Sequence, residues 1–133
     1  MTDEELNELA RGWVAYWHDS KNEDLWEAWN RSNDYMNEAV GSNPIDAWKM
    51  VLVVYALDRS KKIQANLAAG PIEDLLSDHG PLMIEIVEEK ARADPSFAKL
   101  LAGVWKLDSM TDEVWTRLLA VRDYPGWQAI PED

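Results

Sequence analysis

Apolar residues recur at steps of three and four along most of the chain, and this spacing predicts α-helices. The first stripe follows Thr2 and Glu5, which have capping-box spacing, and predicts a helix over about residues 3–18. Asn22 can cap a second helix. Pro44 suits the start of a third, whose wide apolar stripe indicates a central, buried element. No segment alternates apolar and polar residues as a strand does, so we expect an all-α protein.

Glycine followed by proline predicts two helix boundaries in the middle of the chain. At Gly70–Pro71 and Gly80–Pro81 the glycine can adopt the left-handed cap conformation, and the proline suits the start of the next helix. Tight turns of this kind favour antiparallel helical hairpins. We therefore predict about eight short helices in antiparallel hairpins, which form either a compact bundle or an irregular helical-repeat-like array.

The length of 133 residues suits one domain over residues 1–133, with residues 124–133 as a C-terminal tail. The chain has no cysteine, which excludes disulfides and thiolate metal sites and fits a reducing compartment. Its start is acidic, unlike a signal peptide, and no apolar run approaches the roughly 18 residues that span a bilayer. We expect a cytoplasmic protein.

Acidic residues outnumber basic ones by 25 to 13, which gives a formal net charge of −12. This charge repels phosphate backbones and anionic membranes at long range, so we expect no direct nucleic-acid binding and no membrane partner. A basic protein would be attracted and would meet the chain faster, so we expect a basic protein partner. Solubility alone is the other explanation of the acidity.

The candidate partner-binding residues lie on the second predicted helix and share the face opposite its apolar side. They are Glu23, Glu27, Arg31, Asp34 and Glu38. Glu23 with Glu27 and Asp34 with Glu38 are like-charge pairs four residues apart, and each costs a helix a few tenths of a kcal/mol. An ordinary solvated face is one explanation. A basic partner that relieves the repulsion is the other.

A second group of candidates follows Gly70, where Glu73, Asp74, Asp78 and His79 put three carboxylates and an imidazole on about two helical turns. These residue types could form a metal or acid/base site. Capping also explains them, because Glu73 can reach back to the Gly70 N–H and His79 suits the negative helix end. No catalytic, metal or cofactor motif supports the first alternative, so we predict no enzyme activity, no cofactor and no metal.

Eight tryptophans are present, and four of them, Trp13, Trp17, Trp26 and Trp29, fall in the first two predicted helices. Their spacing places them in the core, and an aromatic groove for a partner is the alternative. His18 ends the first helix beside Asp19, where an imidazolium would interact favourably with the helix dipole.

Four stretches of the chain resemble a bacterial domain-of-unknown-function family numbered 6869. They are Trp13 to Trp17, the run from Leu67 through Pro71 and Leu76 to Gly80, and Asp94 to Phe97 continuing to Trp105, with Pro44 to Trp48 adding to the match. The resemblance covers nearly the whole length. It implies a small helical domain, and it lends no activity, cofactor or catalytic residue.

These observations favour a non-enzymatic acidic protein-binding module that docks a basic protein, most concretely a toxin-neutralising immunity protein or a similar small inhibitor. A helical scaffold or adaptor domain is a second hypothesis, in which the acidity serves only solubility. An enzyme or metal site around Glu73, Asp74 and His79 is a third. The identity of the partner, the acidic face that binds it and the oligomeric state stay open.

Overall fold

The computed structural model describes residues 1–131, and all regular elements in this range are helical. The α-helices are α1 (Asp3–His18), α2 (Trp26–Ser42), α3 (Pro44–Leu57), α4 (Lys61–Leu67), α5 (Glu73–Asp78), α6 (Gly80–Ala93), α7 (Pro95–Leu100), α8 (Asp112–Val121) and α9 (Tyr124–Trp127). Two 3-10 turns, η1 (Glu23–Leu25) and η3 (Leu101–Gly103), and a π turn, η2 (Ala68–Ile72), complete the elements. The prediction of an all-α fold of about eight short helices is confirmed.

Local capping fixes the start of the first helix where the sequence predicts it. The Glu5 N–H donates to Thr2 Oγ1 over 3.1 Å, and the Thr2 N–H donates to Glu5 Oε1 over 3.3 Å. These reciprocal bonds satisfy two backbone donors that a helix start otherwise leaves without partners. The bond from the Thr2 backbone lowers the pKa of Glu5, because it favours the carboxylate.

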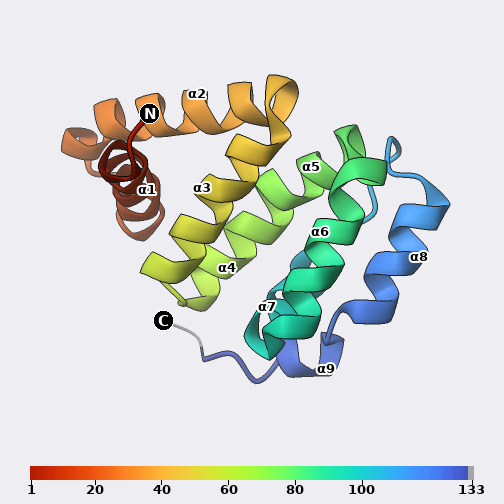
Figure 1. Ribbon diagram of the computed structural model, residues 1–133. Helices are drawn as coiled ribbons and strands as arrows, with labels where there is room; N and C mark the ends of the chain where they lie inside the picture. The colour runs from red at the N-terminus through yellow and green to blue at the C-terminus, as the bar shows by residue number, and fades with distance from the viewer. Residues whose placement is uncertain (132–133) are drawn as a thin grey trace.

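The helices form a compact arrangement around α3 and the segment from α4 to α5 (Figure 1). The pairs α1–α2, α1–α3 and α2–α3 pack together at one end, and α6 packs against α5, α7 and α8 at the other. Ala47, Met50, Val51 and Val54 of α3 have no exposed surface, so the prediction of a central, buried third helix is confirmed. No helix within residues 1–131 is both long enough and apolar enough to cross a membrane.

Gly70–Pro71 does not end a helix, so the boundary predicted there is wrong. α4, the π turn η2 and α5 follow one another without a break from residue 61 to residue 78, and no described glycine has a positive φ. Pro71 has no N–H to donate, and its ring would clash with the carbonyl one turn earlier in a regular α-helix. The wider π turn accommodates both constraints and lets the chain continue as a helix.

Gly80 does begin a helix, but for a reason other than the predicted left-handed cap. Its φ is not positive, and a Cβ built on it would lie 2.8 Å from Val114 Cγ2 on α8. That distance is too short for two carbon atoms, so a side chain at this position would push α6 and α8 apart. Glycine is therefore required for the close packing of these two helices.

An ion pair between the buried Glu88 and the half-exposed Arg117 joins α6 to α8. The Glu88 carboxylate is buried and accepts two bonds from Arg117, one of them from Nε over 3.0 Å. The hydrogen bonds from Arg117 lower the pKa of Glu88, since they favour its charged form. The pair fastens α8, which contributes few other polar contacts to the core.

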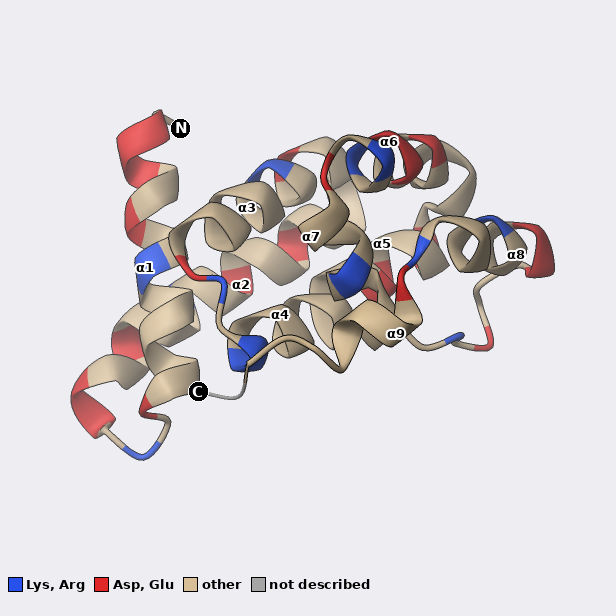
Figure 2. Cartoon of the chain, turned by 90° about the horizontal axis from the view of Figure 1, so that it is seen from below, with Lys and Arg blue, Asp and Glu red and all other residues tan. Residues whose placement is uncertain are grey.

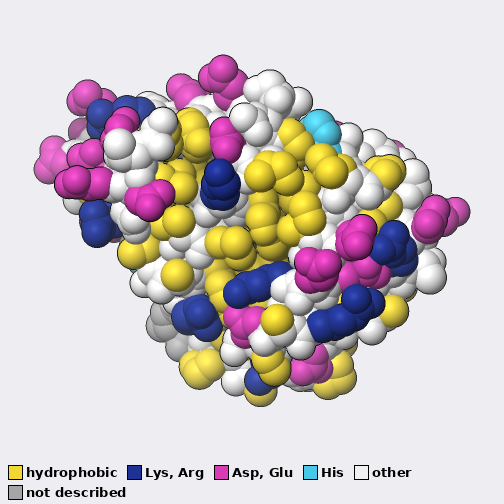
Figure 3. All heavy atoms as spheres, in the orientation of Figure 1, with side chains coloured by type: hydrophobic (Ala, Val, Ile, Leu, Met, Phe, Trp, Pro, Cys, Tyr) yellow, Lys and Arg dark blue, Asp and Glu magenta, His cyan; other side chains and the backbone are white. Residues whose placement is uncertain are grey.

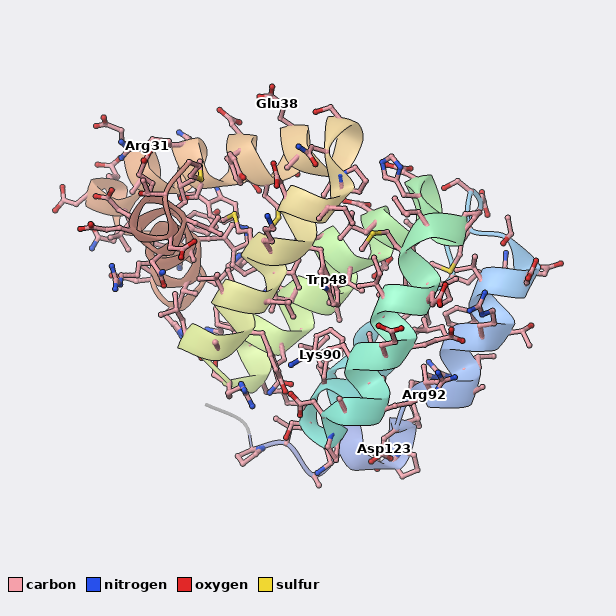
Figure 4. The ribbon with its side chains drawn as sticks, viewed as in Figure 1. Arg31, Glu38, Trp48, Lys90, Arg92 and Asp123 are labelled. Atoms are coloured by element: carbon pink, nitrogen blue, oxygen red, sulfur yellow. The ribbon has the colours of Figure 1, made fainter. Side chains whose placement is uncertain are left out.

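Tyr55 connects α3 with α6 and α7. Its hydroxyl donates to Asp94 Oδ2 over 3.0 Å, and Asp94 Oδ1 accepts from the Ser96 N–H at the start of α7. The Arg59 guanidinium lies 3.8 Å from the centre of the Tyr55 ring, and Lys90 reaches from α6 toward the same ring (Figure 4). Burial, followed by the bond to Asp94, raises the pKa of Tyr55 to about 12.

We predict that Gly80→Ala lowers the free energy of unfolding by about 1–3 kcal/mol, because the new methyl group overpacks the contact with Val114. Gly41→Ala is the matched control, because Gly41 lies in α2 and a Cβ added to it would meet nothing within 4 Å. This change should raise the free energy of unfolding by up to about 1 kcal/mol, since alanine favours a helix more than glycine does. Urea denaturation of both variants measures the difference. A Gly80→Ala protein as stable as the wild type would contradict the close approach of α6 and α8.

Candidate protein-binding surface

Gly12 is the point where α1 and α2 cross at close range. A Cβ at this position would lie 3.0 Å from Ser32 Oγ and 3.2 Å from the Ala28 carbonyl oxygen, closer than ordinary van der Waals contact. Residues of α1 up to Gly12 line a hollow on one part of the α1–α2 interface, and Trp13 and Trp17 line a second hollow on the other. The crossing therefore divides the surface between these helices into two concave regions.

The predicted binding residues of α2 are all exposed and form what we name the acidic ridge: Glu27, Asp34 and Glu38, with Arg31 among them. Within residues 1–131 none of these three carboxylates pairs with a cation. The Glu38 side chain points away from the rest of the molecule (Figure 4). The ridge carries charge that the fold itself does not use.

Glu23 does not share the helix of the acidic ridge, which corrects one part of the prediction. It is exposed and lies in η1, the 3-10 turn that Asn22 caps, and α2 begins only at Trp26. Glu23 and Glu27 therefore do not lie four residues apart within one α-helix, and the repulsion predicted from that geometry does not apply to them. Asp34 and Glu38 do form such a pair within α2, and it costs a few tenths of a kcal/mol.

The hollow before the crossing, which we name the acidic groove, has a volume of about 440 Å³. Glu5 and Glu8 of α1 line it, together with Arg31 and Tyr35 of α2. Burial raises the pKa of Tyr35, and the charge of Asp46 adds to the rise. The groove thus has carboxylates along one wall and one arginine on the other.

Negative charge is concentrated at this end of the molecule. The first 42 residues contain ten Asp and Glu and only three Lys and Arg. Asp and Glu positions recur along α1 and at the turn into α2 (Figure 2), and their side chains gather over these helices in the space-filling view (Figure 3). A basic surface would therefore be attracted to the α1–α2 end first.

Glu73, Asp74, Asp78 and His79 do not converge on one site. Glu73 is buried, whereas Asp74 and Asp78 are exposed. The ring of His79 donates from Nε2 to the Val40 carbonyl oxygen over 2.7 Å, in the last turn of α2. Among the residues that the structure describes, no group of three His, Asp or Glu side chains is arranged to hold a metal ion.

The capping role predicted for Glu73 is wrong, because Gly70 does not start a helix. Burial raises the pKa of Glu73, and the charge of Asp74 raises it further. A bond from the Trp105 backbone N–H acts in the opposite direction and offsets part of the rise. Glu73 therefore connects α5 to the segment after η3. His79 does interact with the carbonyl end of a helix as predicted, but the helix is α2 rather than its own.

His18 lies in the last turn of α1, where the sequence places it, and its ring has a partner that the sequence did not predict. Its Nε2 lies 2.8 Å from Asp58 Oδ2, beyond the end of α3. Burial alone would raise the pKa of Asp58, but bonds from Ser60 and His18 lower it overall. The contact ties the end of α1 to the end of α3, and it lies outside the acidic ridge.

The second hollow, which we name the Trp–Asn cleft, combines residues that the sequence singled out with two asparagines that it did not, Asn33 and Asn37. It has a volume of about 320 Å³ and is lined by Trp13, Trp17 and Trp29, by Asn33 and Asn37, and by the π turn and Asp74. A hollow lined by three tryptophans therefore lies beside the aromatic core, and its use by a partner stays a prediction. Trp29, Asn33 and Asn37 recur every four residues, and this spacing was the available signal.

Comparison with known proteins gives one match. The model of a family described as "Family of unknown function (DUF6869)" matches residues 16–126. No curated protein and no solved structure matches the chain. The matched range covers the end of α1, all of the acidic ridge and the π turn.

We predict that Glu73→Ala lowers the free energy of unfolding by about 1–3 kcal/mol at neutral pH, because the Trp105 N–H loses its acceptor. Glu73→Gln keeps an acceptor oxygen and removes the buried charge, so it should be much less destabilising. The raised pKa of Glu73 makes the folded state bind a proton more readily than the unfolded state. The free energy of unfolding of the wild type should therefore increase as the pH falls through the pKa of Glu73 in the folded state, and should level off below its pKa in the unfolded state. Glu73→Gln should lose this pH dependence.

Chemical denaturation of wild type and both variants between pH 4 and pH 8 measures these effects. Equal destabilisation by Ala and Gln at every pH would contradict the acceptor role. A pH dependence that persists in Glu73→Gln would assign the titration to another group.

Proposed function

The chain belongs to the family of unknown function DUF6869, and from its surface we propose that it is a non-enzymatic protein-binding module that docks a basic protein partner. The partner would contact the acidic ridge and the hollows on both sides of it. At about 100° per residue, Asn37 of the Trp–Asn cleft lies about 80° from the ridge on one side of α2, and Tyr35 of the acidic groove lies about 80° from it on the other. A basic surface that covers the ridge would therefore reach both hollows.

The observation that carries this proposal is the set of exposed carboxylates without partners on α2. Glu27, Asp34 and Glu38 pair with no cation in residues 1–131, and two of them repel each other within the helix. Other carboxylates, such as Glu88 and Asp94, serve the fold as ion-pair partners and caps. Uncompensated charge beside concave surfaces favours fast encounter with a molecule of opposite charge.

An immunity protein, or a similar small inhibitor that neutralises a basic toxin, is the concrete form of this module that we propose. Such a protein needs a stable fold and a complementary surface, and it needs no catalytic group. We also propose that it acts in the cytoplasm, since the absence of cysteine suits a reducing compartment.

The immunity form predicts that a reading frame next to the gene encodes a small, basic toxic domain. Expression of that domain alone should arrest growth, and co-expression of this chain should restore it. Growth curves with and without this chain measure the effect. Flanking products that are not toxic, or toxicity that this chain leaves unchanged, would reject the immunity form.

We predict that replacing Glu27, Asp34 and Glu38 with Gln, Asn and Gln slows association with the basic partner and flattens its dependence on salt. The fold should be equally or slightly more stable, because the repulsion within α2 is removed. Association and dissociation rates at low and high salt separate the two effects, since charges at the rim change the on-rate and buried paired charges change the off-rate.

The matched control replaces the exposed residues Glu85, Glu89 and Asp108 with Gln, Gln and Asn, which removes the same charge from positions outside α1 and α2. This control should bind with rates close to those of the wild type. If the α2 variant binds like the wild type at every salt concentration, the acidic ridge is ordinary solvated surface. If both variants slow association equally, net charge rather than the ridge directs the encounter.

A further inference from the structure

The Trp–Asn cleft has the dimensions of a pocket for one side chain. Its volume of about 320 Å³ lies at the lower end of the roughly 300–1,000 Å³ typical of ligand sites. Its walls come from α1, α2, α4, the π turn and α5, so elements distant in the sequence meet there. The π turn carries Gly70, and a Cβ built on this residue would meet nothing within 4 Å.

One wall of the cleft is a block of tryptophan rings that hold one another in place. The ring centres of Trp13 and Trp17 are 5.8 Å apart, those of Trp17 and Trp29 are 5.2 Å apart, and Tyr16 stacks on Trp29 at 4.0 Å. Such rings attract a cation within about 6 Å of a ring centre and also pack against the methylene groups of a long side chain. The wall is therefore suited to lysine or arginine.

Asp74 supplies a negative charge at the same cleft. It makes no ion pair or side-chain hydrogen bond within the described part of the chain. Although Asp74 is exposed, partial desolvation in the cleft raises its pKa, and the charge of Asp78 adds to the rise. A bound ammonium or guanidinium group would compensate this charge.

Amide groups complete the cleft. The side chains of Asn33 and Asn37 lie one turn apart on α2, and neither makes a hydrogen bond to the rest of residues 1–131. Each amide can donate and accept at once, which matches the N–H and C=O groups of an extended peptide backbone. The buried indole N–H of Trp17 also has no acceptor in this range. The cleft thus offers hydrogen bonds that a peptide could complete.

We infer that the Trp–Asn cleft binds a lysine or arginine side chain of the basic partner, with Asp74 next to the cation, the tryptophan rings along its stem, and Asn33 and Asn37 at the flanking peptide backbone. This inference deepens the proposed function and rests on a basic protein being the partner. The acidic ridge speeds the encounter, and the cleft selects which basic segment stays bound.

The test uses acetylated and amidated pentapeptides with one central residue between pairs of alanines. The central residue is lysine, arginine, norleucine or glutamate, and binding is followed by NMR signals of the tryptophan indoles and asparagine amides. We expect the lysine or arginine peptide to shift the signals of Trp17, Trp29, Asn33 and Asn37 in a saturable way. Norleucine has a similar stem without the charge and should bind about tenfold more weakly. The ratio between lysine and arginine identifies which cation the cleft prefers.

Variants assign the contacts. Asp74→Asn should weaken binding of the cationic peptide by about tenfold and leave norleucine binding unchanged. Asp108→Asn is the control for loss of one exposed carboxylate and should change neither. Asn33→Ala with Asn37→Ala should weaken the cationic and norleucine peptides by a similar factor, because the backbone contacts are common to both. Retained thermal stability of each variant shows that the fold is intact.

Three outcomes would overturn the inference: no saturable shift at the cleft, norleucine binding as tightly as lysine, or Asp74→Asn binding like the wild type. The ridge variant separates this result from the proposed function. If it loses binding to the basic partner while Asp74→Asn does not, the module docks through the ridge and the cleft inference fails. If the cleft binds the lysine peptide but the ridge variant binds the partner like the wild type, the cleft inference stands and the role of the ridge fails.

Discussion

The close crossing of α1 and α2 at Gly12 is the constraint on which the functional surface depends. Because Gly12 carries only a hydrogen atom, α1 can pack directly against Ser32 and the Ala28 backbone of α2. A Cβ added at Gly12 would lie 3.0 Å from Ser32 Oγ and 3.2 Å from the Ala28 carbonyl oxygen. The acidic groove and the Trp–Asn cleft both adjoin this contact. Gly12 and Ser32 line the groove, and the next residue on each helix, Trp13 and Asn33, lines the cleft. A larger residue at Gly12 would change the shape of both at once.

Two groups of carboxylates in this protein differ in their partners. Glu88 and Asp94 accept hydrogen bonds from side chains of other helices, which hold their pKa values low and fasten α8 and α7 to the core. On α2, Glu27, Asp34 and Glu38 are exposed to solvent and pair with no cation of residues 1–131. Charge in the first group maintains the fold. Charge in the second group costs the helix a little free energy and is free to act on another molecule.

The π turn is the feature that connects the core to the Trp–Asn cleft. It keeps residues 61–78 in one helical run although Pro71 interrupts the regular hydrogen bonds. The run passes beside α2, and this brings Asp74 to the same hollow as the tryptophans of α1. A helix stop at Gly70 would have allowed the chain to turn away. π turns occur often at functional sites, and here the irregular turn packs Ala68 and Ile72 into the core while its Ala69, Gly70 and Pro71 line the cleft.

The sequence alone determined the features that depend on neighbours within about one helical turn. The capping box of Thr2 and Glu5, the start of α3 at Pro44, the apolar surface of α3 and the exposed charges of α2 were all predicted, because caps and amphipathic stripes are local. The tertiary structure decided what depends on residues distant in the chain. Gly80 faces Val114, and Glu73 bonds to the Trp105 backbone; neither partner is visible from local spacing. The Trp–Asn cleft follows the same rule. The spacing of Trp29, Asn33 and Asn37 places three side chains on one face of α2, and this is local. Only the packing of α1, α2 and the π turn makes that face a wall of a cleft that Asp74 also lines.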